Sequence, residues 1–174
     1  MRHAPQEVRT FFVTAVTWHR RPLFRADPMA RLFLDTLAHY RDQGRYLIHE
    51  FVLMPDHFHL LPTPAPEVSL EKTMQLLKGG FSFRVKHELG SNAEVWQQGF
   101  TEHRVKNAKD YEHHALYVRE NPVRARLAEN AAAYPYGPAA SDAELDPAPP
   151  GLKPAITKGA LFAGLKSGAS TEVR

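Results

Sequence analysis

The chain has 174 residues, a length at which one domain with an additional segment is the first expectation. Hydrophobic residues make up 43% and charged residues 24%, which excludes a wholly disordered, collagen-like or coiled-coil chain. Cysteine is absent, so disulfides and thiolate metal sites are excluded. The net charge of +3 permits a nucleic-acid partner without requiring one, and the ten histidines point to imidazole chemistry.

No run of about 18 apolar residues is present, so we expect no membrane-spanning helix. The first seven residues lack the apolar stretch of a secretory signal, and we expect a cytoplasmic protein. Composition changes near Gly137: 18 of the 38 residues from there to the end are Pro, Ala or Gly. We therefore expect a folded domain at residues 1–136 and a loosely ordered tail at residues 137–174. Four apolar residues of the tail suit a short docked helix: Ile156, Leu161, Phe162 and Leu165.

In the first half of the domain, periodicity predicts a strand, a helix and a β-hairpin. Residues 9–18 are β-branched and aromatic, as in a strand. A helix follows, capped by Asp27 and ended by Gly44. Strands at residues 46–54 and 57–63 are joined by a tight turn at Pro55 and Asp56.

The second half predicts a helix, a strand and a closing helix. An apolar stripe runs from Leu70 to Leu89, although two adjacent glycines weaken that helix. A short strand covers residues 100–105, and Asp110 caps a helix that ends at about Asn121, before a proline. The resulting order is that of an α+β, ferredoxin-like split βαβ fold. Helices would cover one face of its antiparallel sheet, leaving the other face for a catalytic site.

The strand at residues 57–63 carries two histidines. Because side chains alternate along a strand, Phe58 and Leu60 should enter the core while His57 and His59 point together to the opposite face, about 6–7 Å apart. Two neutral imidazoles on one face can share a metal ion. The alternative is two ordinary polar residues on a half-exposed strand, and the spacing alone also occurs in zinc hydrolases.

The closing helix places Tyr117 and Asn121 four residues apart, on one face with His114. By itself, Tyr117 fits a tyrosine packed at a domain edge, and Asn121 fits a residue at a helix C-terminus. Only the combination with the histidine pair favours a catalytic interpretation.

Several segments resemble the REP-associated tyrosine transposases, which belong to the single-tyrosine HUH transposases of bacterial insertion sequences. The Met-Pro-Asp-His-Phe-His block at residues 54–59 and the Tyr-x-x-x-Asn-Pro-Val block at residues 117–123 are the most specific. The resemblance covers about residues 8–136 in the same order and includes these further segments: residues 12–14, 21–24, 49–61, 96–100 and 117–125.

The resemblance implies that His57 and His59 are metal ligands, that Asn121 is the third ligand, and that Tyr117 is the catalytic tyrosine. It implies Mg²⁺ or Mn²⁺ as cofactor and single-stranded or hairpin DNA as partner. Cleavage near an imperfect hairpin would leave a 5′-phosphotyrosine and a free 3′-OH. Either a monomer or a homodimer is consistent with it, because insertion-sequence relatives exchange the tyrosine helix between subunits.

The residue types suit this chemistry. A phosphotyrosine can be displaced again by a DNA 3′-OH, so a phenol supports reversible transesterification. Two imidazoles and one amide oxygen leave the charge of the cation undiminished for the phosphate. Imidazole by itself favours zinc or later transition metals, so the expectation of Mg²⁺ or Mn²⁺ rests on the resemblance.

Basic and aromatic side chains near these motifs are candidates to bind phosphates or to stack on unpaired bases. Each could equally lie on a solvated face, and the tryptophan could lie in the core. They are Arg20, Arg21, Lys78, Arg84, Lys86, Trp96, Arg104, Lys106, Arg119 and Arg124.

The sequence thus predicts an enzyme, a metal-dependent single-strand DNA endonuclease and strand-transferase, that is, a transposase. One alternative is a DNA-hairpin-binding protein that derives from a transposase and no longer cleaves. Another is a zinc-dependent phosphoesterase that uses water in place of Tyr117. A covalent protein–DNA adduct that depends on Tyr117 separates the first interpretation from the other two.

Overall fold

The described part of the protein folds around a four-stranded antiparallel sheet. The computed structural model describes residues 8–153, and its strands are β1 (Phe11–Val16), β2 (Tyr46–Met54), β3 (His57–Pro64) and β4 (Thr101–Arg104). The strand order is β2-β3-β1-β4, and all neighbouring pairs are antiparallel. With helices after β1 and β3, this is the ferredoxin-like arrangement that the sequence predicted.

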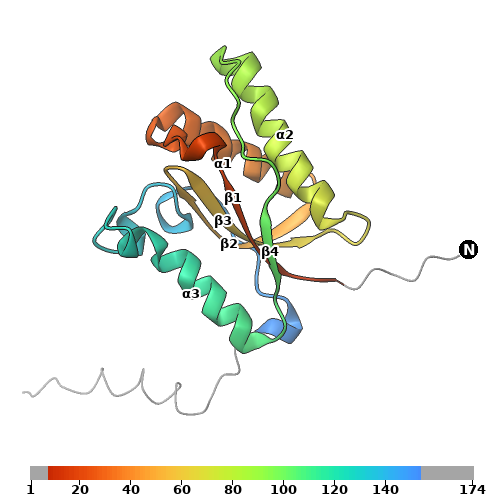
Figure 1. Cartoon of the computed structure of the whole chain (residues 1–174). Helices are drawn as coiled ribbons and strands as arrows, with labels where there is room; N and C mark the ends of the chain where they lie inside the picture. Colours follow the sequence, from red (N-terminus) through yellow and green to blue (C-terminus); the bar gives the residue numbers. More distant parts are fainter. Residues whose placement is uncertain (1–7, 154–174) are drawn as a thin grey trace, which may run out of the picture.

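Helices lie on both faces of the sheet. α1 (Asp27–Asp42) and α2 (Leu70–Leu89) cover one face, and α3 (Ala108–Arg124) crosses the other (Figure 1). The face that the sequence left for a site is therefore partly covered by the helix that carries the tyrosine. Among residues 8–153, no helix has the length and apolar character needed to cross a membrane.

The larger core lies between the sheet and the α1–α2 layer. Alternation along β3 sends Phe58 and Leu60 into it, as predicted, where they join Phe33 of α1 and Phe81 of α2. Each of these four side chains is at most 2% exposed, and burying one of this size stabilises the fold by about 1.5–3 kcal/mol. At the last turn of α2 the predicted stripe fails, and Leu89 is 41% exposed because the helix runs past the sheet (Figure 1).

A smaller core attaches α3 to the second face of the sheet. Val118 is fully buried and, with Tyr111 and Ala115, packs in one cluster with Val52 of β2 and Leu61 of β3. Leu61 and His59 share this face of β3, so the packing of α3 also determines what the histidine meets.

Both ends of α3 differ from the prediction. Asn107 caps the helix in place of Asp110, because its side-chain oxygen accepts a hydrogen bond from the Asp110 amide at 2.9 Å. The Asp110 carboxylate is thereby left for other partners. At the other end, the helix continues past Asn121 to Arg124, with Pro122 inside it. A proline removes one helical hydrogen bond, and the burial of the Pro122 side chain offsets that loss in the last turn of the helix.

The first two helices show smaller differences. α1 begins at Asp27 itself, after Ala26, so Asp27 lies in the first turn and pairs with Arg31 at 2.8 Å. α2 runs without interruption through its two glycines. A Cβ at Gly80 would overlap the Tyr40 side chain of α1, so glycine here permits the close approach of the two helices.

Residues 137–153, which composition assigned to the tail, contact the edge strand β2. The Asp146 amide donates to the Ile48 carbonyl at 2.7 Å, and the Asp146 carboxylate accepts from the Ile48 amide and twice from Arg41. These bonds pair main-chain groups at the free edge of the sheet. The domain boundary after residue 136 stays a prediction. Four residues predicted to dock lie outside the described residues: Ile156, Leu161, Phe162 and Leu165.

His49 of β2 connects to the same segment and should make stability depend on pH. Its side chain is buried, with Nε2 2.7 Å from Thr63 Oγ1 and Nδ1 3.2 Å from the Asp146 carbonyl. Burial lowers the pKa of His49 below its ordinary value in spite of the Asp146 carbonyl. As the pH falls, the unfolded chain is therefore protonated first. The contribution of His49 to the free energy of unfolding should be complete above about pH 6.5. Below that pH the free energy of unfolding should fall by at most about 1.4 kcal/mol per pH unit.

We expect His49→Gln, which can keep the bond to Thr63, to weaken this loss of stability between about pH 7 and pH 5. Urea unfolding at several pH values measures it. His39→Gln, at an exposed position on α1, is the matched control and should behave as the native protein does. The same pH slope in His49→Gln and in the native protein would contradict the assignment.

Candidate active site

β3 holds His57 and His59 together on the face that α3 covers. They share one face of the strand, as its alternation predicted, and their ring centroids lie 4.8 Å apart, closer than the expected spacing of about 6–7 Å. His59 is 6% exposed, whereas His57 is only partly buried at the start of the strand. One imidazole is thus held in the fold and the other borders solvent.

A neighbouring oxygen orients each imidazole through Nδ1. His59 Nδ1 is 2.7 Å from Thr14 Oγ1, on the residue of β1 that lies opposite His59 in the sheet. His57 Nδ1 is 2.6 Å from the Asp56 carboxylate. When both Nδ1–H groups donate to these oxygens, both Nε2 atoms carry the lone pair that a metal ligand needs. The roles of Thr14 and Asp56 were not predicted from the sequence, although alternation along β1 could have indicated Thr14.

The protein keeps His59 uncharged. Burial first, and then the neighbouring His57, lower the pKa of His59 to about 3. The imidazole therefore stays neutral across the physiological range, and a cation can bind without first displacing a proton from it.

α3 brings Tyr117 to the same place. The Tyr117 ring centroid is 5.4 Å from that of His59, and both rings pack on Phe12 of β1. The Arg124 guanidinium lies 5.0 Å from the centroid of the Tyr117 ring, in a cation–π contact. Asn121 is partly buried one turn after Tyr117, on the same side of α3.

The donor atoms of the three predicted ligands are of types that bind divalent cations. His57 and His59 are two oriented imidazoles, and Asn121 adds an amide oxygen on the adjoining helix without adding negative charge. Such a set leaves coordination positions open for a substrate.

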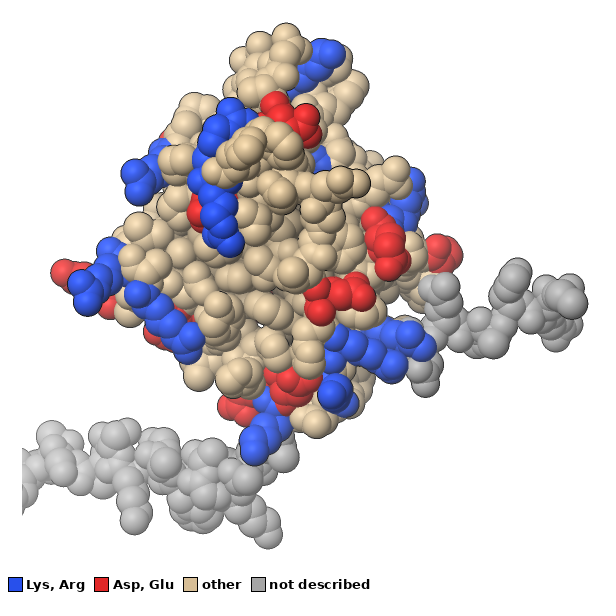
Figure 2. All heavy atoms as spheres, viewed as in Figure 1, with Lys and Arg blue, Asp and Glu red and all other residues tan. Residues whose placement is uncertain are grey.

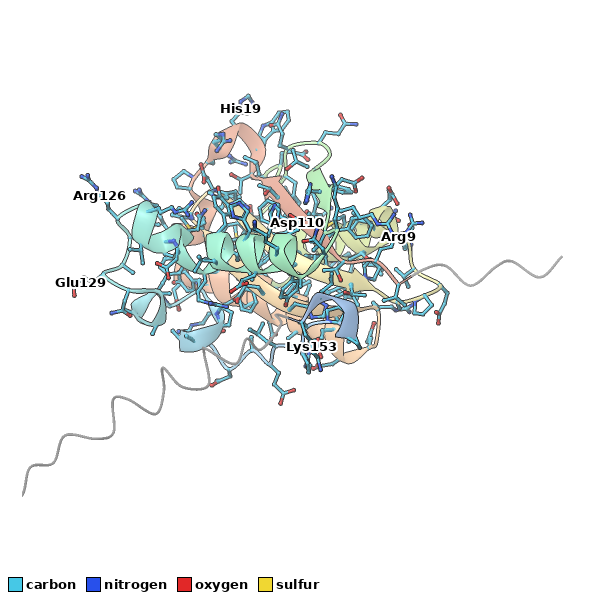
Figure 3. All side chains as sticks on the ribbon, turned by 90° about the horizontal axis from the view of Figure 1, so that it is seen from below. Arg9, His19, Asp110, Arg126, Glu129 and Lys153 are labelled. Carbon is cyan, nitrogen blue, oxygen red and sulfur yellow. The ribbon has the colours of Figure 1, made fainter. Side chains whose placement is uncertain are left out.

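A second group with metal-binding chemistry lies between β4 and the start of α3. It consists of His103, Asp110 and His114, whose ligand atoms all lie within 4.8 Å of one another. Figure 3 shows Asp110 toward one end of α3, with Arg126 beyond the other. Burial raises the pKa of Asp110, but hydrogen bonds from His103 and from the Lys106 amide outweigh it and leave that pKa below its ordinary value. This group was not predicted from the sequence, although the spacing of Asp110 and His114 at i and i+4 could have indicated it.

Four of the predicted DNA contacts belong to α2 and the loop after it, on the opposite side of the sheet from the histidine pair. The Lys78 ammonium donates to two loop carbonyls, at 2.6 and 3.1 Å, and Arg84 pairs with carboxylates of α1 and α2. Lys86 is exposed on the same helix. Trp96 is 7% exposed in the main core, and its Nε1 donates to the Lys78 carbonyl. Trp96 therefore fits the alternative that the sequence left open, a residue of the core.

Other candidates lie near β1 and β4. Arg20 is 3.5 Å from the Asp56 carboxylate that contacts His57. Arg21 donates to the main-chain carbonyls of Trp18 and Glu94. Arg104 on β4 and Lys106 after it are exposed. Figure 2 shows Lys and Arg in separate groups around a largely uncharged centre, with no continuous basic band on the face in view.

Comparison with known proteins establishes the family. Residues 9–121 match the family described as "Transposase IS200 like", and this range includes His57, His59, Tyr117 and Asn121. It also includes every strand of the sheet and most of α3. The chain belongs to the IS200-like transposase family.

Individual relatives confirm the resemblance to REP-associated tyrosine transposases. The REP-associated tyrosine transposase of Escherichia coli K12 is 26% identical over 138 residues, which cover 75% of this chain and 80% of that protein. A relative from Haemophilus influenzae Rd, described in similar terms, is 30% identical over 95 residues, 48% of this chain and 53% of that one. A solved REP-associated tyrosine transposase bound to a REP hairpin shares the fold, with a TM-score of 0.62, 22% identity and coverage of 90% of this chain and 98% of that chain.

Arg119, another predicted DNA contact, forms an ion pair that attaches α3 to β2. Its guanidinium donates to the Glu50 carboxylate at 3.0 Å, and the Glu50 side chain is 5% exposed. Burial raises the pKa of Glu50, and Arg119 opposes that rise. Because the carboxylate is buried, the arginine compensates a charge that water cannot reach.

We expect Arg119→Met to lower the free energy of unfolding by about 1–3 kcal/mol near neutral pH. This is less than the loss expected for a fully buried ion pair, because solvent partly screens Arg119. Without the arginine the pKa of Glu50 rises further, so the loss should be small near about pH 5 and grow as the pH increases. The double variant Arg119→Met/Glu50→Gln should recover much of the stability. Urea unfolding at about pH 5 and pH 8 tests this, and equal losses at both pH values would contradict it.

Proposed function

We propose that this protein is a single-strand DNA endonuclease and strand-transferase that acts near DNA hairpins, with Tyr117 as its nucleophile. The observation that carries the proposal is the approach of Tyr117 to His59, with ring centroids 5.4 Å apart in one chain. Membership of a transposase family and a shared fold with a relative bound to a REP hairpin support it.

His57, His59 and Asn121 would hold the divalent cation, for which we propose Mg²⁺ or Mn²⁺. When bound, such an ion neutralises charge on the non-bridging phosphate oxygens and helps to orient the phosphate. The protein keeps the ligands ready: Thr14 and Asp56 fix the two rings through Nδ1, and burial keeps His59 neutral.

In the cleavage step, the Tyr117 hydroxyl oxygen attacks the phosphorus and the bond from phosphorus to the DNA 3′ oxygen breaks. The phenol loses its proton to solvent and the departing oxygen gains one, which leaves a 5′-phosphotyrosine and a free 3′-OH. One phosphodiester replaces another, so a 3′-OH can reverse the step or join a new end. Arg124, beside the Tyr117 ring, would contact the phosphate carried by that tyrosine.

The same contacts support catalysis within one chain. Tyr117 shares Phe12 with His59 of its own chain, and Val118 anchors the helix on the same sheet. A helix exchanged between subunits is not needed to bring the tyrosine to the histidines, so we propose the monomer as the working form.

Incubation with Mn²⁺ and single strands that carry imperfect hairpins tests the proposal. We expect a protein–DNA adduct that survives denaturing electrophoresis and vanishes in Tyr117→Phe, because only the phenol oxygen forms the covalent bond. Tyr111→Phe, on the same helix but in the smaller core, is the matched control and should form the adduct.

Other outcomes identify the alternatives. Hairpin binding that persists with a chelator, without an adduct on any substrate, indicates a non-cleaving DNA-binding protein. Hydrolysis that persists in Tyr117→Phe indicates attack by water. Either outcome contradicts the proposal.

The role of Thr14 gives a second prediction. Thr14→Val removes the oxygen that orients His59, and loss of such a supporting bond weakens metal binding by about 10–100-fold. Titration of the metal-free protein with Mn²⁺, followed by electron paramagnetic resonance, measures the affinity. Thr101→Val, at an exposed position of β4, should bind as the native protein does, and native affinity in Thr14→Val would refute the role.

A further inference from the structure

His103, Asp110 and His114 are not explained by the proposed DNA chemistry. Within residues 8–153 they form the one group of three His, Cys, Asp or Glu side chains that can converge on a single ion. His103 comes from β4, whereas Asp110 and His114 come from the first two turns of α3. A bound ion would therefore join a strand to the helix that carries Tyr117.

The spacing of the ligand atoms is close to that of a bound metal. His103 Nε2 is 2.8 Å from Asp110 Oδ2, and His114 Nδ1 is 3.1 Å from Asp110 Oδ1. Zinc–ligand bonds of about 2.0–2.1 Å in a tetrahedron place ligand atoms about 3.3 Å apart. To bind an ion, His114 Nδ1 would have to leave the Asp110 main-chain carbonyl, from which it lies 2.9 Å, and the side chains would have to converge on the ion.

The surroundings of the cluster already orient its members. The Lys106 amide donates to Asp110 Oδ2 at 2.9 Å, and Asn107 holds the Asp110 amide. The rings of His103 and His114 stack with centroids 4.7 Å apart and an angle of 22° between their planes. Each of the three side chains is at most 39% exposed, so the ligands are partly withdrawn from water while an ion can still enter.

The cluster is separate from the histidine pair of β3. Phe12 lies between the two groups, with its ring centroid 5.4 Å from that of His59 and 4.8 Å from that of His114. The ligand set also differs, because a carboxylate takes the place of the Asn121 amide; two imidazoles with a carboxylate favour zinc or another late transition metal.

We propose that His103, Asp110 and His114 form a second metal site, which takes Zn²⁺ or a similar transition-metal ion and fastens the start of α3 to β4. Three protein ligands leave a fourth position for water. The site would stabilise the position of the tyrosine helix from the end opposite to Arg124. This inference does not depend on the proposed DNA cleavage.

The test uses the untagged full chain, stripped of metal, in a His57→Ala/His59→Ala background that removes the other imidazole pair. We expect one equivalent of Zn²⁺ to bind by calorimetry, Co²⁺ to give the visible absorption of a tetrahedral site, and Zn²⁺ to raise the Tm. Adding His103→Gln should weaken Zn²⁺ binding at least 10-fold, because the amide can keep the bond to Asp110 but replaces the imidazole ligand.

His113→Gln in the same background is the matched control, because His113 is an exposed histidine of the same helix. It should bind Zn²⁺ like the background protein. The metal-free Tm of each variant reports whether it is folded. Absence of Zn²⁺ binding in the folded background protein, or equal affinity in His103→Gln and His113→Gln, would overturn the proposal and leave a hydrogen-bonded cluster only.

Discussion

The register of β3 between its two neighbours determines the candidate active site. In this register Thr14 faces His59 on one side and Val52 faces it on the other. Side chains alternate with a period of two, so a slip of one residue would turn both histidines into the α1–α2 core and expose Phe58 and Leu60. The buried phenylalanine and leucine make such a slip costly, and the same packing that stabilises the sheet therefore keeps both imidazoles on the side of α3.

The position of Tyr117 depends in turn on how α3 is attached. Val118, the residue after Tyr117, is fully buried on the sheet, and Arg119 pairs with the buried Glu50 of β2. At the start of the helix, Asp110 is hydrogen-bonded to His103 of β4. These three contacts restrict both rotation and sliding of α3. The ring of Tyr117 is therefore held beside Phe12 and His59. The proposed transesterification would need such pre-organisation, because a nucleophile must be placed before the phosphate arrives.

Local patterns were sufficient to predict most of the fold. Alternation gave the faces of β3, turn residues gave the β2–β3 hairpin, and the apolar stripe gave α2 in spite of Gly79 and Gly80. The exact helix ends were harder to predict, since Asn107 and Asp110 are both good capping residues and only the hydrogen bond distinguishes them. Pro122 predicts a helix end, because the burial of its ring is a tertiary effect that the local sequence does not show.

For the site, the residues that the sequence predicted have local spacing, and several of the contacts that it missed join distant residues, although Asp56 beside His57 was missed as well. His57 and His59, or Tyr117 and Asn121, are neighbours on one element. The pairing of Thr14 with His59 spans 45 residues, and that of Arg119 with Glu50 spans 69. Charge alone could not show that Arg119 and Lys78 already have partners within the fold, or that Trp96 fills the core. Long-range packing decides these cases.

The most direct measurement is ¹⁹F NMR of the protein labelled with 3-fluorotyrosine, titrated with paramagnetic Mn²⁺. The chain has six tyrosines, and the Tyr117 signal is assigned by its loss in Tyr117→Phe. If the phenol and the imidazoles surround one cation within a chain, a single equivalent of Mn²⁺ should broaden the Tyr117 signal, and His59→Ala should prevent it. A Tyr117 signal that stays sharp in the Mn²⁺-bound native protein would contradict this arrangement.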